Sequence, residues 1–451
     1  MKLLKSYWWK SGAYTFMERF SLQLFRFGSF FLLIRSLTKE EYGIWAIFLI
    51  ISAIIEVVRV GLIQNALIKA MTSNKDPKVQ ARISTASLTL NLGFALIFTI
   101  LLFGLAQLQY YWFGEILLEN LLHMYIFTYL FLVPFFHFTF LAQAVFDFRT
   151  IFIANFVRQL VFFCFVLVVH LNPEWEFRVL HLAGMQAVGA LLGSVTAYLF
   201  GRQYIRFSSK LDMDWVRWLF NYGKFVVGTN LGSMLAKSMD SLMLGAMINP
   251  VATAVYSTAI KISNLVEVPT QSMAAIVFPK SSQRVEAEGK HAVKALYEKS
   301  VAVLLAMITP GVLFVMIFPE FVIQLVAGDQ YLEAVPILRV TMVYGLFVPF
   351  SRQFGTMLDA IGKPGVNFFI VLSSALFNGL LNFLFIGKMG IIGAAYATLT
   401  SCALFFIISQ IILYREVGIK LWKIFVYAYK VYAGGFLLLR RKISSYSASR
   451  V

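Results

Sequence analysis

The sequence places several basic side chains inside long apolar stretches, where a charge is costly unless it faces a polar interior. Arginine holds a phosphate group through forked contacts, and lysine through a compact point charge. These residue types therefore predict an interior site that binds an anion. The candidates for anion contacts are Arg26, Lys237, Arg352, Arg59, Arg158 and Lys261.

Arg26 is the strongest of these candidates, because no acidic residue lies three or four positions away from it. Glu56 and Arg59 are three residues apart and therefore share one helical face, and Lys237 and Asp240 have the same spacing. For both pairs, mutual neutralisation is the alternative to contact with a substrate.

Carboxylates in the apolar stretches predict a second kind of chemistry, the binding of a coupling ion. Glu267, Asp240 and Glu56 are candidates for a site that binds H+ or Na+. A hydrogen bond between helices is the alternative role for Glu267. His123 and His137 lack Cys or carboxylate partners, so we expect packing residues rather than metal ligands. The sequence has no Walker A motif, so we expect no cofactor and no direct use of ATP.

Long apolar segments must position these residues. Of the 451 residues, 59% are hydrophobic and 14% are charged, whereas a soluble domain has about 25% charged residues. This composition predicts an all-α polytopic membrane protein with about 12 transmembrane helices. Prolines inside the segments, including Pro134, Pro269 and Pro349, predict kinks. The predicted spans are 12–36, 43–69, 84–108, 120–146, 150–171, 179–201, 220–247, 253–279, 296–318, 332–358, 366–387 and 390–414.

The net charge of +17 is distributed unevenly over the loops between these spans. Segments on the side of the N-terminus hold most of the loop Lys and Arg, whereas the opposite loops hold Lys39, Arg178 and Lys388. By the positive-inside rule, we expect a multi-pass protein of the plasma (bacterial inner) membrane with both termini cytoplasmic. The excess charge therefore reports topology, and we expect no nucleic-acid partner. Residues 421–439 form either an interfacial helix or a thirteenth span.

An internal repeat organises the chain, because residues 26–69 align with residues 237–280 without a gap. The matched landmarks are Arg26 with Lys237, Trp45 with Tyr256, Ile51-Ser52 with Ile262-Ser263, Glu56-Val57 with Glu267-Val268, and Lys69 with Lys280. Repeats of this kind build two-lobed transporters. We expect six-helix lobes at 1–205 and 220–415 around a central cavity, a cytoplasmic linker at 206–219 and a basic tail at 416–451.

Three motifs carry a resemblance to a known family. Residues 35–45 are similar to the pattern R-x-L-x-x-x-x-Y-G-x-[WY], and residues 238–245 are followed by Ala254-Val255-Tyr256. Residues 358–364 lead to a glycine- and alanine-rich stretch at 390–395. Together they resemble the polysaccharide-flippase branch of the MATE-like multidrug/oligosaccharidyl-lipid/polysaccharide exporter superfamily, over residues 10–415.

The resemblance implies a two-lobed, alternating-access flippase for a polyprenyl-pyrophosphate-linked oligosaccharide, as in the biosynthesis of lipopolysaccharide O-antigen. The implied partners are this lipid-linked substrate, the bilayer, H+ or Na+, and other polysaccharide-assembly membrane proteins. A multidrug antiporter of the same superfamily is the alternative, and it predicts a cavity rich in carboxylates. A membrane glycosyltransferase or polymerase would need a large outer loop, and the outer loops are short, so we expect no enzyme.

Overall fold

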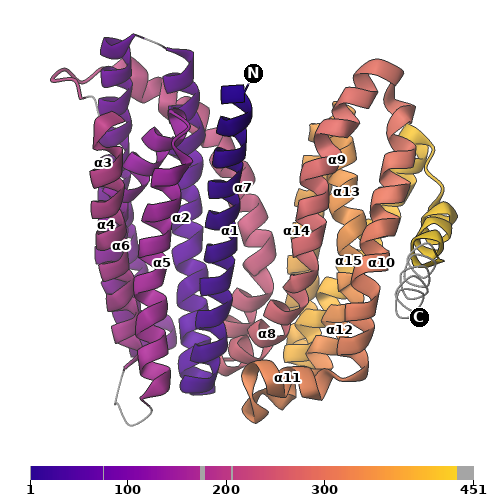
Figure 1. The fold of residues 1–451 in the computed structure, drawn as a ribbon. Helices are drawn as coiled ribbons and strands as arrows, with labels where there is room; N and C mark the ends of the chain where they lie inside the picture. The colour runs from indigo at the N-terminus through magenta and orange to yellow at the C-terminus, as the bar shows by residue number, and fades with distance from the viewer. Residues whose placement is uncertain (1, 75, 173–177, 205–206, 434–451) are drawn as a thin grey trace, which may run out of the picture. The chain divides into compact units, whose positions relative to one another are not determined.

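The computed structural model describes residues 2–74, 76–172, 178–204 and 207–433, and every regular element in these ranges is helical (Figure 1). The all-α fold class predicted from the sequence is confirmed. By contacts, the chain divides into two compact units, unit 1 from Met1 to Ser238 and unit 2 from Met239 to Val451. The division falls within α7, whereas the repeat predicts lobes at 1–205 and 220–415, and those boundaries stay a prediction.

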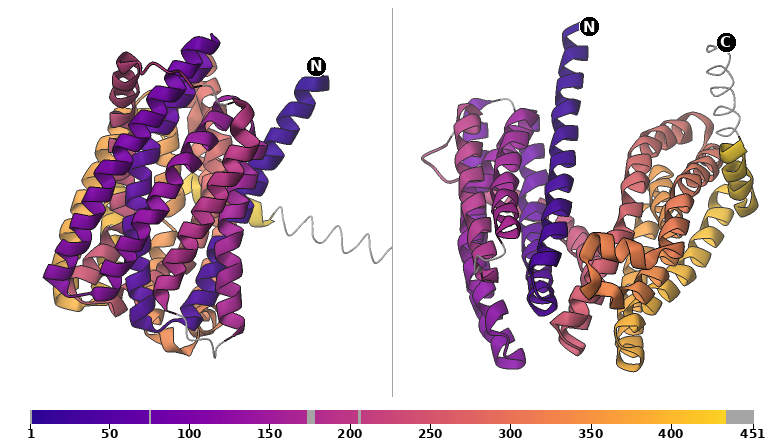
Figure 2. Two further views of the ribbon diagram at one scale, coloured as in Figure 1. Left: turned by 90° about the vertical axis from the view of Figure 1, so that its left-hand side faces the viewer. Right: turned by 60° about the horizontal axis from the view of Figure 1, so that its bottom comes forward.

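Unit 1 is a bundle of long helices. Its elements are α1 (Lys2–Ser36), α2 (Lys39–Ser73), α3 (Pro77–Phe113), α4 (Ile116–Ala144), α5 (Phe148–Leu171), α6 (Val179–Gly201) and the first part of α7 (Met213–Met247). Thr38 starts α2 with a capping box, in which its hydroxyl accepts from Glu41 N and the Glu41 carboxylate accepts from Thr38 N. Within the unit, α1 packs along α5, as Figures 1 and 2 show.

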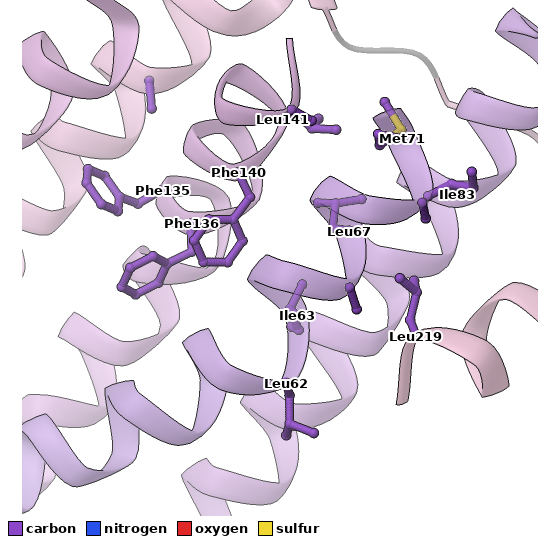
Figure 3. Close-up of a cluster of buried hydrophobic side chains, with 14 of the residues drawn as sticks. Leu62, Ile63, Leu67, Met71, Ile83, Phe135, Phe136, Phe140, Leu141 and Leu219 are labelled. Carbon is purple, nitrogen blue, oxygen red and sulfur yellow. The ribbon is translucent and has the colours of Figure 1, made fainter. Parts of the chain in front are cut away.

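A cluster of buried hydrophobic side chains holds this bundle together (Figure 3). Leu62, Ile63 and Leu67 of α2 meet Phe136 and Phe140 of α4, with further contributions from α3 and α7. The approach of α7 is close because Gly223 has no side chain. A Cβ atom at that position would lie 2.0 Å from the Leu62 carbonyl oxygen.

Unit 2 contains two broken helices. Its elements are the rest of α7, α8 (Pro250–Ser263), α9 (Glu267–Glu288), α10 (Lys294–Ile317), α11 (Pro319–Ala327), α12 (Val335–Gly345), α13 (Val348–Ala360), α14 (Pro364–Met389) and α15 (Ile391–Val417). The turn at Asn264–Val266 separates α8 from α9, and Leu346–Phe347 separates α12 from α13. Pro269 and Pro349 follow the breaks, where a missing N–H costs little. Val266 lies 3.7 Å from the ideal Cβ position of Gly345, so the two breaks are adjacent.

The predicted membrane spans all fall on helices. Nine helical segments of the described residues are long and apolar enough to cross a bilayer. The predicted spans 12–36, 220–247 and 253–279 are not among these nine, but they are helical as well, in α1, α7 and α8–α9. Two predicted spans, 253–279 and 332–358, contain the breaks described above. The chain is therefore a multi-pass membrane protein.

Two connecting segments are held against their own units. Part of the predicted linker packs on unit 1, because Ser208 N donates to Thr85 Oγ1 at 2.8 Å and Phe207 stacks on His137. In unit 2, residues 421–433 form a helix that runs alongside α10. Lys420 N donates to Glu298 Oε1, and Tyr432 Oη donates to the Ala306 carbonyl eight residues further along α10. The choice between an interfacial helix and a thirteenth span for 421–439 stays a prediction, and 434–451 lie outside the described residues.

Candidate functional site

Two arginines of unit 1 lie on neighbouring helices, α1 and α5, within electrostatic range of each other. Arg26 is an exposed residue of α1, and Arg158 is a partly exposed residue of α5. Arg26 lies within electrostatic range of Arg158 and of Glu56 from α2. The sequence-predicted residues Arg26, Arg158 and Glu56 thus form one group, in which two cations share one carboxylate. A group of this kind carries a net positive charge that an anion neutralises.

The position of Arg158 is fixed by its surroundings. Its guanidinium carbon lies 4.9 Å from the centre of the Phe135 ring of α4, a cation–π contact. Its backbone touches α6 so closely that a Cβ on Gly189 would lie 2.7 Å from the Arg158 carbonyl oxygen. Arg158 Nε is buried and has no hydrogen-bond partner among the described residues. The side chain is therefore anchored while part of its hydrogen-bonding capacity stays unused.

Arg59 of α2 lies in a different environment, fully buried against α4. Its guanidinium carbon is 3.4 Å from the centre of the Tyr129 ring, and Nη2 donates to the Tyr129 carbonyl at 3.0 Å. Pro134 interrupts the hydrogen bonding of α4 nearby, and Ser194 and Asn91 likewise donate to carbonyls of the preceding turn. In this structure Arg59 joins α2 to α4, and its direct contact with an anion stays a prediction.

Glu56 is held by a tyrosine rather than by its neighbour in sequence. The single hydroxyl hydrogen of Tyr125 is shared between two acceptors, Glu56 Oε1 at 3.3 Å and the Ser52 carbonyl at 3.1 Å from Oη. No ion pair between Glu56 and Arg59 occurs among the residues that the structure describes. The partly exposed Glu56 carboxylate is therefore available to Arg26.

The other predicted anion contacts lie apart from this group in the chain. Lys237 is exposed on α7, at the end of unit 1. In unit 2, the partly exposed Lys261 lies near the end of α8 and the exposed Arg352 lies on α13, so the two flank the two helix breaks. Their roles as anion contacts stay predictions.

A buried polar network surrounds Asp240 in unit 2. Asp240 Oδ1 accepts from Asn382 Nδ2 at 2.6 Å. Asp240 Oδ2 accepts from Thr398 Oγ1 at 2.7 Å and from the hydroxyl of Tyr256. Asn378 continues the network, because its Oδ1 accepts from Asn382 and its Nδ2 donates to Thr398. Four helices, α7, α8, α14 and α15, thus converge on one carboxylate.

The chemistry of this network fits a small cation. Asn382 is fully buried, and its Oδ1 has no hydrogen-bond partner in the described part of the chain. A buried carbonyl oxygen beside a carboxylate, two hydroxyls and a second amide is an oxygen donor set suited to a hard cation. Protonation of Asp240 is the other way to neutralise a buried charge. The described residues contain no group of three His, Cys, Asp or Glu side chains that could hold a metal ion. The Asp240 network differs from such a group, because its oxygen atoms come from one carboxylate, two amides and two hydroxyls.

Sequence reasoning identified Asp240 but missed its partners. Asn378 and Asn382 are four residues apart in the apolar span 366–387, which is itself an available signal of a polar site in the membrane. Thr398 and Tyr256 gave no such signal, because a single hydroxyl in a span is common. Glu267 lies elsewhere, at the start of α9, where it accepts from Gln271 Nε2 at 3.0 Å. Tyr344 of α12 lies within electrostatic range of both Glu267 and Asp240.

The all-helical fold and the long apolar helices define a polytopic membrane protein, and comparisons with known proteins specify its family. Residues 32–336 match the family described as polysaccharide biosynthesis protein, and the chain belongs to that family. It is 31% identical over 200 residues to the uncharacterized membrane protein MJ1068 of Methanocaldococcus jannaschii, which covers 44% of this chain and 39% of the relative.

A second relative carries a functional name. The chain is 25% identical over 214 residues to a protein of Haloferax volcanii named "probable low-salt glycan biosynthesis flippase Agl15", covering 47% of this chain and 45% of the relative. The matched regions span less than half of the length of these curated relatives.

Solved structures support the fold. A multidrug resistance MATE family transporter in an inward-facing conformation matches with a TM-score of 0.75 at 14% identity, over 87% of this chain and 94% of that one. The lipid II flippase MurJ in an inward closed conformation matches with a TM-score of 0.72 at 12% identity, over 95% and 92%. The MATE-like fold implied by the sequence motifs is confirmed.

Proposed function

We propose that this protein is a flippase that moves a polyprenyl-pyrophosphate-linked oligosaccharide from the inner to the outer leaflet by alternating access. The observation that carries the proposal is that Arg26 and Arg158 lie within electrostatic range of each other, on adjacent helices of a membrane-embedded unit. Two cations held together in lipid surroundings are stabilised by an anion, and a pyrophosphate offers several acceptor oxygens to forked guanidinium donors. The transport of sugar and phosphate across about 30 Å of hydrocarbon requires such a shielded polar site.

Membership of the polysaccharide biosynthesis family and the flippase name of the Haloferax relative support this substrate class. The relatives are named as transporters or membrane proteins, and this agrees with a role in transport rather than in sugar transfer. The loops predicted to lie on the same side of the membrane as the N-terminus are rich in lysine and arginine. This distribution supports a plasma-membrane location with cytoplasmic termini. Other membrane proteins of polysaccharide assembly would supply and consume the lipid-linked sugar.

Asp240 is our proposed site for ion coupling by Na+ or H+. The support is the convergence of Asn382, Thr398 and Tyr256 on its carboxylate, together with the unpartnered Asn382 Oδ1. Asp240 would hold the cation, and Asn378 and Asn382 would supply amide oxygens. Glu267 and Glu56 are partly exposed and rank behind it.

Reconstitution into liposomes tests the proposal. The substrate is a fluorescent polyprenyl pyrophosphate bearing one N-acetylglucosamine, and the readout is the fraction of headgroups that an external reagent reaches. Wild type should accelerate flipping, and Arg26→Ala and Arg158→Ala should each slow it at least tenfold, since each removes a charged contact of about 1.5–3 kcal/mol. Arg178→Ala, at an exposed outer position, is the matched control. Export of organic cations without any flipping would instead identify a multidrug antiporter.

A further inference from the structure

A carboxylate–amide pair lies on the seam between α1 and α5, toward the inner side of the Arg26–Arg158 group. Glu18 Oε1 accepts a hydrogen bond from Asn155 Nδ2 at 2.9 Å, and both side chains are partly exposed. Glu18 also lies within electrostatic range of Arg19 and Arg158. Along the contact between α1 and α5, the polar side chains therefore change from the Glu18–Asn155 pair to the two arginines, Arg158 and Arg26.

Aromatic rings flank this pair at the same contact between α1 and α5. Tyr14, one turn before Glu18, lies with its ring centre 6.2 Å from that of Phe152, which is one turn before Asn155. Phe152 in turn lies 5.7 Å from Phe156. Sugar rings present C–H groups on a flat face and hydroxyls at their edges. Aromatic rings next to a carboxylate and an amide offer contacts to both.

The pair keeps hydrogen-bonding capacity that suits sugar hydroxyls and does not suit phosphate. Glu18 Oε2 and Asn155 Oδ1 accept no hydrogen bond within the described residues, and both are acceptors. Hydroxyl groups can donate to them, whereas the oxygens of a pyrophosphate would be repelled by the carboxylate. Glu18 and Arg26 are eight residues apart in α1, about 12 Å along the axis. That spacing is close to the length of a pyrophosphate joined to one sugar.

We propose that Glu18 and Asn155, flanked by Tyr14 and Phe152, form a glycan-binding subsite. It contacts the first sugar of the lipid-linked substrate while Arg158 and Arg26 bind the pyrophosphate. This inference rests on the proposed function and adds a specificity-determining pair to it. The two subsites together make the protein prefer a glycosylated polyprenyl pyrophosphate over the bare lipid pyrophosphate.

The structure offers a matched control for a purely structural role of the pair. Gln107 Nε2 donates to Glu119 Oε1 at 3.0 Å, so this second carboxylate–amide pair joins α3 to α4 in the same unit. A ring contact also lies next to this pair, because the ring centre of Phe103, one turn before Gln107, is 5.3 Å from that of His123, one turn after Glu119. Glu119 is not among the charges that act on Arg26, so this pair lies apart from the arginine group. Glu119→Gln should therefore reproduce any general cost of weakening an interhelical pair.

Binding to the full-length protein in nanodiscs tests the subsite with two probes. One is a polyprenyl pyrophosphate without sugar, and the other is the same lipid bearing N-acetylglucosamine. Glu18→Gln and Phe152→Leu should each weaken binding of the glycosylated probe about tenfold and leave the bare probe unchanged, because a charged hydrogen bond or a ring contact to sugar is lost. Glu119→Gln should change neither affinity.

Equal loss for both probes, or no loss for either, would overturn the glycan subsite while leaving the flippase proposal in place. Failure of the wild-type protein to bind either probe would overturn both proposals. Asn155→Asp gives a further check, because it keeps an acceptor but places a second carboxylate beside Glu18. We expect it to weaken binding of the glycosylated probe more than that of the bare probe.

Discussion

An Asp240→Ala substitution removes the acceptor of three buried hydrogen bonds in unit 2. The hydroxyls of Tyr256 and Thr398 and one N–H of the Asn382 amide donate to this carboxylate, and alanine leaves these two hydroxyls and this N–H without their acceptor. A buried donor without a partner costs about 1–3 kcal/mol. The three together predict a loss of about 3 kcal/mol or more in the free energy of unfolding of unit 2.

Asp240→Asn should behave differently because the network can rearrange around it. The new carbonyl oxygen can continue to accept from Thr398 and Tyr256, and the new NH2 group would face Asn382. A flip of the Asn382 amide presents its unpartnered Oδ1 to that NH2 group. The flip gives up the bond from Asn382 to Asn378, so the expected cost is about 1 kcal/mol. The substitution also removes a buried charge, which offsets part of that cost.

Thermal unfolding in detergent, compared between Na+ and choline buffers, separates stability from cation binding. Wild type should be stabilised by Na+, by about 2.7 kcal/mol at a concentration one hundred times Kd. Asp240→Asn should keep most of its stability in choline and lose the response to Na+. Equal destabilisation by Asn and Ala would refute the hydrogen-bond reasoning. A full Na+ response in Asp240→Asn would refute the assignment of the cation site, and a pH response in place of a Na+ response would assign the site to H+.

Three further substitutions test the packing of the units. Gly223→Ala should destabilise unit 1 strongly, because the added Cβ would overlap the Leu62 carbonyl, whereas Gly228→Ala on the same helix meets nothing within 4 Å; equal melting temperatures would contradict this. Arg59→Lys should cost about 1–3 kcal/mol in unfolding experiments, since lysine cannot both stack on a ring and donate sideways to a carbonyl. Glu416→Gln breaks bridges to Lys290 and Lys363 near the end of α15 and should cost under about 1 kcal/mol, with a difference that shrinks in high salt.

The helices could be predicted from the sequence because the bilayer leaves few choices. A span needs about 20 apolar residues with internal hydrogen bonds, and each predicted span therefore coincides with helix. The breaks at Asn264–Val266 and Leu346–Phe347 were less visible. Pro269 and Pro349 mark kinks in the sequence, but hydropathy does not distinguish a bent helix from one that ends and restarts.

The polar sites could be predicted only in part. Depth within a span identified Arg26, Arg158 and Asp240, since charge in an apolar segment is conspicuous. The burial of Arg59 was not foreseen, because helical periodicity does not reveal which face packs against Tyr129. The pairing of Asp240 with Asn382 depends on contacts between residues more than a hundred positions apart. No local pattern encodes such contacts.

The internal repeat gives the two units related helices but different chemistry. It aligns Asp240 with Ser29 and Tyr256 with Trp45. Ser29 is buried, and its hydroxyl has no hydrogen-bond partner in the described part of the chain. Trp45 is buried in ring contacts with Phe48 and Phe162. Unit 1 therefore has neither a carboxylate nor a hydroxyl partner at the positions that build the network of unit 2.

This difference separates the two functions that we propose. The network around Asp240 has no counterpart at the aligned positions of unit 1, so a single Asp240 substitution should abolish the whole cation response rather than half of it. Conversely, Arg26→Ala should weaken substrate binding and leave the Na+ dependence of unfolding unchanged. A residual cation response in Asp240→Asn that disappears only when Glu56 is also replaced would show that unit 1 binds a cation too, and would contradict this division.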